Sequence, residues 1–168
     1  MTKKIQHDVF GNLKYEYGWV KDKEIYCFNK NRTIQIVIEA DENAEFESSQ
    51  EEAYIKFSNN FDVLLVKAED AIYKYYQEVC LEYRDRLGDD IKDKIAPIVK
   101  SKQEIKELVK PKQILFPMVF DENIREFGIL LDCNWEEEHG LVVKFQNEEV
   151  VEVSKSNADS GLVGIGKT

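Results

Sequence analysis

The sequence predicts an α+β fold in which an N-terminal antiparallel β-meander and a C-terminal antiparallel β-meander flank central helices that pack on the sheet. Three observations lead to this class: strand-like alternation in residues 13–39, helical spacing of apolar residues in 48–87, and a return of short apolar runs in 113–153. The 168 residues suffice for one domain with a full core. We expect residues 1–153 to form that single domain and residues 154–168 to form a flexible tail.

The first quarter of the chain predicts three strands. Alternation is clearest in the third, where Ile34, Ile36 and Ile38 share one face. The expected strands cover residues 13–20, 24–28 and 33–39, with turns at residues 21–23 and 29–32. Short turns between successive strands favour an antiparallel arrangement.

The central third predicts helices. A Ser-x-x-Glu capping box at Ser48 indicates a helix start there, and a longer helix is expected over residues 62–87, ending at Gly88. Its apolar residues recur every three or four positions, which is typical of a helix packed on a sheet. A second capping box at Ser101 predicts a short helix to about residue 109.

The last third returns to strand patterns. Pro117 lies inside the first apolar run and favours an edge strand or a bulge there. The expected strands cover residues 113–120, 126–133, 141–145 and 150–153. Polar turn residues separate them, so a second antiparallel meander follows.

The charge balance narrows the classes of partner. The chain has 33 acidic and 23 basic residues and a net charge of −10. Such a chain is repelled by nucleic-acid phosphates and by anionic membranes. A basic protein partner would instead be attracted and steered toward it.

Cysteine usage predicts the redox compartment. Cys27, Cys80 and Cys133 are an odd number at wide spacing, without a Cys-x-x-Cys pattern. A reduced, cytoplasmic protein with free thiols is the simplest account. The first residues show no signal-peptide pattern, and no run approaches the length of a membrane span.

Residues 130–141 predict a β-hairpin with an acidic turn that also carries cysteine, tryptophan and histidine. Asp132, Cys133, Glu138 and His139 are all possible zinc ligands. Adjacent strand residues point to opposite faces, however, and no His-x-x-x-His spacing is present, so we expect no metal site and no cofactor. A catalytic pair of His139 with Cys133 or Cys80 is disfavoured because both cysteines lie on apolar faces.

Three segments together resemble a known family. They are the Gln-x-x-Ala-Tyr helix at residues 50–54, the Tyr-Tyr pair at 75–76 and the Cys-x-Trp-x-x-Glu-His-Gly hairpin at 133–140. This combination resembles a bacterial domain family of unknown function, over residues 11–153. Members occur near polymorphic toxins, including contact-dependent growth inhibition systems, and several look like immunity proteins. The resemblance implies a cytoplasmic, non-enzymatic immunity protein that binds and neutralises a cognate toxin.

The resemblance and the charge together point to acidic contact residues. Many such toxins are cationic nucleases, and acidic patches would mimic their phosphate ligand. The expected toxin-contacting residues are Glu42, Glu45, Glu47, Glu51, Glu52, Trp135, Glu136, Glu137, Glu138 and His139. Two alternatives stay open: an enzyme with a site at the Asp132–His139 hairpin, or an assembly module that dimerises through an edge strand near Gln113 or Pro117.

Overall fold

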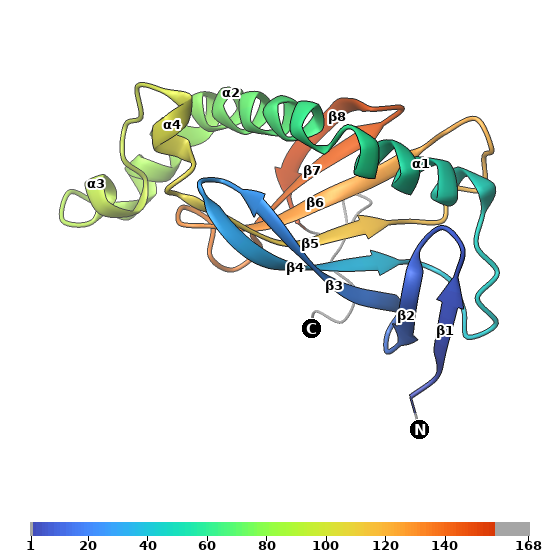
Figure 1. Cartoon of the computed structure of the whole chain (residues 1–168). Helices are drawn as coiled ribbons and strands as arrows, with labels where there is room; N and C mark the ends of the chain where they lie inside the picture. Colours follow the sequence, from blue (N-terminus) through green and yellow to red (C-terminus); the bar gives the residue numbers. More distant parts are fainter. Residues whose placement is uncertain (1, 157–168) are drawn as a thin grey trace.

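A single sheet of eight strands forms the frame of the protein. The computed structural model describes residues 2–156, and the strands lie in the sheet in chain order (Figure 1). The strands are β1 (Lys4–His7), β2 (Gly11–Tyr15), β3 (Trp19–Cys27), β4 (Lys30–Ile38), β5 (Val109–Phe116), β6 (Glu126–Cys133), β7 (Leu141–Gln146) and β8 (Glu149–Lys155). All neighbours are antiparallel except β4 and β5, which are parallel. The predicted α+β class and the two meanders are confirmed.

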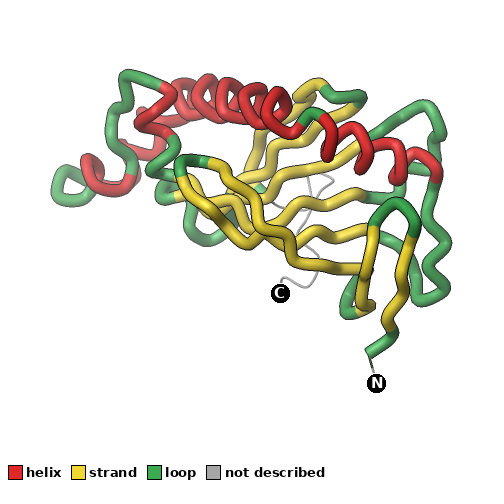
Figure 2. Tube along the Cα trace, in the orientation of Figure 1, coloured by secondary structure: helices red, strands yellow, loops and turns green. Residues whose placement is uncertain are grey.

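Helices cover one face of this sheet. Figure 2 shows the two long helices crossing the same side, end to end. The helices are α1 (Ser48–Asn59), α2 (Phe61–Leu87), α3 (Lys92–Ile95) and α4 (Lys102–Ile105). None of the helices between residues 2 and 156 combines the length and apolar character needed to span a membrane.

The parallel contact between β4 and β5 determines where the helices run. Ile36 pairs with Ile114 and Ile38 with Phe116, so the two strands run in the same direction and finish at the same end of the sheet. A parallel pair cannot be joined by a tight turn, because the chain must travel back along the whole strand length. Residues 39–108 make this return, with α1 near the strand ends and α2 running back over β6 to β8.

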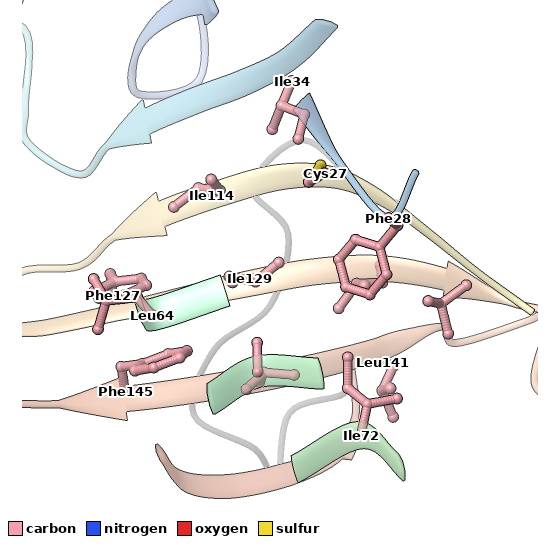
Figure 3. Packing of buried hydrophobic residues seen from close by; sticks show 14 of the residues in the cluster. Cys27, Phe28, Ile34, Leu64, Ile72, Ile114, Phe127, Ile129, Leu141 and Phe145 are labelled. Carbon is pink, nitrogen blue, oxygen red and sulfur yellow. The ribbon is translucent and has the colours of Figure 1, made fainter. Parts of the chain in front are cut away.

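The main core lies between this helix layer and the sheet. Figure 3 shows Leu64 and Ile72 of α2 together with Phe127, Ile129 and Phe145 of the sheet. The three isoleucines predicted to share a face in β4 are at most 1% exposed and belong to this core. A smaller buried cluster has one residue from each of β3 to β7: Val20, Val37, Leu115, Leu130 and Val142. By strand alternation, these five lie on the opposite face.

Gln50 locks the ends of the parallel strands to α1. Its side chain is 1% exposed, and Nε2 donates to the carbonyl oxygens of Glu39 at 2.8 Å and Phe116 at 3.0 Å. Its Oε1 accepts the backbone N–H of Glu47 at 2.8 Å. The helix starts at Ser48 as predicted, but the capping box uses Glu47 and Gln50 and begins one residue earlier than predicted.

The N-terminal strands differ from the prediction. Residues 13–20 do not form one strand, because a turn at residues 16–18 separates β2 from β3. The predicted turn at residues 21–23 lies inside β3, where it pairs with β4. Strand β1 was not predicted, because its polar residues at the edge of the sheet show no apolar alternation.

The second half follows the prediction more closely. Strand β6 covers the predicted residues 126–133, and α2 begins one residue earlier than predicted and ends where expected. Strand β5 begins at Val109, earlier than predicted, because α4 stops at Ile105 instead of continuing to 109. The strand ends at Phe116, four residues before the predicted end. The register slips after Pro111, whereas Pro117 lies in the loop that follows the strand. The predicted tail starts too early, because residues 154 and 155 belong to β8, which pairs with β7; its residues 157–168 lie outside the described residues.

Replacing Gln50 tests the lock at the parallel strands. The Gln50→Leu variant removes the side-chain donor to the carbonyl oxygens of Glu39 and Phe116, of which the second still accepts the N–H of Glu39 at 3.0 Å. We therefore expect the free energy of unfolding to fall by about 2 kcal/mol. Urea denaturation of the full chain measures this. Glu52→Gln, an exposed change on the same helix, should alter stability by about 0.5 kcal/mol or less. Equal stability of the two variants would contradict the role of Gln50.

Candidate functional site

The loop between β5 and β6 presents a large apolar side chain to solvent. Phe120 is 82% exposed, and its backbone has a φ of 57°, in the left-handed region that phenylalanine rarely adopts. Unusual backbone of this kind persists only when neighbouring groups hold it in place. The loop therefore presents an exposed aromatic ring in a fixed position.

Two carboxylates hold this loop. Oε1 of Glu47 accepts the N–H of Val119 at 2.8 Å, and Oε2 accepts the N–H of Phe120 at 2.9 Å. Oε1 of Glu39 accepts the N–H of Met118 at 2.7 Å. Hydrogen bonds to ionised carboxylates are stronger than those between neutral groups. The end of β4 and the start of α1 therefore fix the position of Phe120.

Exposed acids share this end of the sheet with Phe120. Figure 1 shows the loop before α1 and the loop after β5 at the same end, and the bonds to Glu39 and Glu47 join them. We call this the Phe120 surface: Phe120 with the exposed acids Asp41, Glu42, Glu45, Glu52, Asp121 and Glu122. The nearby Arg125 is engaged by Glu148 through two bonds of 2.8 and 2.7 Å. The exposed Lys3 also reaches this end, where its Nζ donates to the carbonyl oxygen of Glu42 at 2.6 Å, so the surface combines an apolar ring at Phe120 with acids that outnumber the nearby bases.

Two of the predicted contact acids before and within α1, Glu47 and Glu51, interact with other parts of the fold. The carboxylate of Glu47 is used inside the fold, as described above. Glu51 lies 3.3 Å from Nε2 of His7, which links α1 to β1. Glu42, Glu45 and Glu52 remain exposed.

The hairpin acids lie at the other end of the sheet. Glu136 is partly buried, and its Oε1 accepts the hydroxyl of Tyr83 at 2.8 Å. Nζ of Lys155 lies 3.5 Å from the same oxygen, and Nδ1 of His139 lies 3.5 Å from Oε2. Burial raises the pKa of Glu136, but the bond from Tyr83 and the neighbouring His139 and Lys155 outweigh it, so this pKa lies below its usual 4.5. Glu137 and Glu138 are exposed.

Other hairpin residues belong to the core. Trp135 is 4% exposed, and its ring lies 4.6 Å from that of Tyr76, so the indole offers no contact surface. Burial raises the pKa of the Cys133 thiol to about 12, which keeps it protonated and unreactive. Asp132 lies on the other face and pairs with Lys112 at 2.7 Å.

The possible zinc ligands of the hairpin do not converge on one point. Asp132 and Cys133 open onto opposite faces, as strand alternation requires. Within residues 2–156, no group of three or more histidine, cysteine or carboxylate side chains is placed to hold a metal ion. The two predicted acidic clusters do not form one patch, because one lies at the start of α1 and the other beside the last part of α2.

Sequence reasoning missed Phe120, Asp121 and Glu122. It placed Phe120 at the end of an apolar strand, because residues 113–120 are nearly all apolar. A usable signal was present: Pro117 inside the run, followed by a polar turn at residues 121–123. Together these end the strand before Phe120.

The fold is a single-sheet α+β domain with an exposed aromatic ring and exposed acids at one end of the sheet. A family model described as Domain of unknown function (DUF6985) matches residues 9–160, so the chain belongs to this family. The expected membership in a family of unknown function is thereby confirmed. Comparisons with curated proteins and with solved structures gave no match.

Gly140 closes the hairpin in a conformation that only glycine accepts without strain. Its φ is 70°, and a Cβ at this position would lie 2.5 Å from the carbonyl oxygen of Leu131. We expect Gly140→Ala to lower the free energy of unfolding by about 2 kcal/mol or more. Gly11→Ala is the control, because Gly11 also has a positive φ but meets only the tip of Lys21, at 3.7 Å. That variant should lose about 1 kcal/mol; an equal loss would contradict the backbone clash.

The lowered pKa of Glu136 predicts a pH dependence of stability. The folded state binds this proton less tightly than the unfolded state, so the contribution is full above pH 4.5 and is lost as the pH falls through the folded pKa. The stability advantage of the wild type over Glu136→Gln should therefore shrink between about pH 5 and pH 3. Urea denaturation across this range measures it, with Glu137→Gln as the exposed control. A difference independent of pH would refute the assignment.

Proposed function

We propose that this protein is a cytoplasmic immunity protein that binds a cognate bacterial toxin and neutralises it. The observation that carries the proposal is the Phe120 surface, an 82% exposed aromatic ring held in left-handed backbone by Glu47. The hairpin and helix motifs that resemble immunity-associated families support it. The three thiols, Cys27, Cys80 and Cys133, are free and buried, which suits a reducing compartment.

The proposed contact combines an anchor with a charged rim. Aromatic side chains at the centre of an interface contribute much of the binding energy when they enter a pocket on the partner. Surrounding acids add little affinity through exposed pairs, but they accelerate the encounter with a basic partner. The net charge of −10 acts in the same direction. The partner should therefore be basic and carry an apolar pocket for Phe120.

Pre-organisation strengthens this contact. Because Val119 and Phe120 already donate their N–H groups to Glu47, the loop loses little freedom when a partner binds. The hairpin end contributes less to the proposed interface. Trp135 is buried and Glu136 is engaged by Tyr83, which leaves Glu137 and Glu138 as its exposed acids. A catalytic hairpin and an assembly module stay predictions of the sequence alone.

The test uses the product of the adjacent upstream gene in the native genome as the binding probe, and the proposal expects this product to be a basic toxin. Tagged full-length protein should capture it stoichiometrically at low salt and release much of it at high salt. Phe120→Ala should weaken the complex by about 30-fold or more, the loss typical of an aromatic anchor. Calorimetry measures the affinity, and survival of cells that express the toxin measures neutralisation.

Charge reversal separates the two ends of the sheet. The triple variant Glu45→Lys, Glu52→Lys and Glu122→Lys should slow association and flatten its salt dependence. The control reverses the two exposed hairpin acids, Glu137 and Glu138, and should change both the association rate and its salt dependence much less. If the hairpin variant loses binding while Phe120→Ala and the triple variant keep it, the proposed interface is wrong. If no variant affects a captured toxin, the proposed interface is likewise wrong; if no toxin is captured, the immunity function itself fails.

A further inference from the structure

Most of β3 has an open edge. The strand pairs with β4 along all nine of its residues, but β2 pairs only with Trp19 and Val20. Figure 1 shows the β1–β2 hairpin beside one end of β3, while the rest of the strand continues along the margin of the sheet. Among residues 2–156, no strand pairs with residues 21–27 on this side. Open edges of this length are templates for pairing with another strand.

The register shows which backbone groups face outward. A two-residue turn at Phe28 and Asn29, with φ values of 49° and 68°, makes Cys27 and Lys30 a hydrogen-bonded pair. Hydrogen-bonded pairs alternate along an antiparallel ladder. The N–H and C=O groups of Asp22, Glu24 and Tyr26 therefore point away from β4. A partner strand would find these groups in the spacing that it needs.

Two hollows lie along the same edge. One of about 490 Å³ lies where β2 leaves β3 and includes Val20 and Lys21 in its walls. The other, of about 260 Å³, lies between β3 and the junction of α1 and α2. Ile25, Phe57 and Phe61 give the second hollow an apolar wall. A strand beside β3 could place one apolar side chain in it.

The charges on β3 alternate between the two faces. Lys21 and Lys23 lie on the helix side, where both approach the ring of Tyr54, at 4.7 and 5.9 Å. Asp22 and Glu24 are exposed on the other side. Two copies of this chain paired antiparallel about a twofold axis would place lysine opposite lysine and acid opposite acid. Like charges directly opposite are destabilising, so the edge disfavours its own copy.

We propose that the open edge of β3 binds an extended segment of another protein by strand addition. The segment has basic residues opposite Asp22 and Glu24, an acid opposite Lys23, and an apolar side chain for the hollow beside Ile25. Main-chain hydrogen bonds would hold it, and the alternate side chains would select it. This inference is independent of the toxin proposal, because the Phe120 surface lies on loops that β3 does not form.

A synthetic peptide tests the edge directly. Antiparallel to β3 from Tyr26 to Lys21, the complementary sequence is Thr-Leu-Arg-Glu-Lys-Val, with blocked ends and a fluorescent label. Fluorescence anisotropy with the full-length chain measures binding up to about 1 mM protein, where even a weak complex is populated. Saturable binding is expected. A second peptide with the charges exchanged, Thr-Leu-Glu-Lys-Glu-Val, should bind at least about tenfold more weakly.

A proline at Glu24 blocks the edge and spares the fold. Its outward N–H has no partner in β4, so Glu24→Pro removes a donor for the peptide but none from the β3–β4 ladder. We expect at least about tenfold weaker binding, while Glu24→Gln, which keeps the N–H, should lose less. A peptide N-methylated at the amides that face β3 gives the same test on the unaltered protein, should the proline variant fail to fold.

The outcomes decide between occupants. Binding that needs the outward N–H of Glu24 and the matched charges supports strand addition. Absence of saturable binding, or binding unaffected by both the proline and the N-methyl groups, overturns the proposal. A concentration-dependent dimer of the free chain that Glu24→Pro abolishes would also overturn it, because a second copy would then occupy the edge; sedimentation velocity detects this.

Discussion

The parallel contact between β4 and β5 is the constraint on which the other features depend. It joins two antiparallel halves into one sheet, and it forces the chain to return across that sheet between Ile38 and Val109. The return supplies α1 and α2, and their apolar faces bury one side of the sheet. Gln50 binds the ends of both parallel strands, so the start of α1 cannot move independently of them. Glu47, at the start of α1, accepts the N–H of Phe120 and so fixes the loop that carries this residue.

Acidic residues serve two distinct purposes in this molecule. Glu39, Glu47 and Glu136 face inward or along loops, where each carboxylate accepts hydrogen bonds that join separate elements. In the Phe120 surface, Asp41 and Asp121 also accept hydrogen bonds, but local ones, from the N–H groups of Asn43 and Asn123. The exposed acids of this surface contribute the charge that a partner would meet. The net charge of −10 counts acids of both groups, so fewer acids are available for recognition than the charge suggests. Only the structure shows which acids belong to which group.

The sequence predicts the elements from α1 onward more closely than the N-terminal strands, and it predicts long-range pairing poorly. Strand β6 and helix α2 follow from apolar spacing and from the turn or glycine that ends them. The parallel seam could not be predicted, because Ile36 and Ile114 are far apart in the chain and no local pattern records their pairing. Trp135 and Phe120 reversed their expected exposures for the same reason: whether an aromatic ring is buried depends on what the fold places above it. The sequence shows where acids cluster, but it does not show that Glu47 and Glu136 use their carboxylates in hydrogen bonds within the fold.

The three buried thiols give the molecule built-in reporters of local opening. Cys27 ends β3, Cys80 lies in α2 and Cys133 ends β6, so each thiol reports on a different element around the core. Burial raises the pKa of Cys27 to about 11 and that of Cys133 to about 12, so these two sites supply almost no thiolate in the closed state. Alkylation of Cys27 and Cys133 therefore proceeds through transient exposure of each site. The two rates compare how readily the ends of β3 and β6 open to solvent.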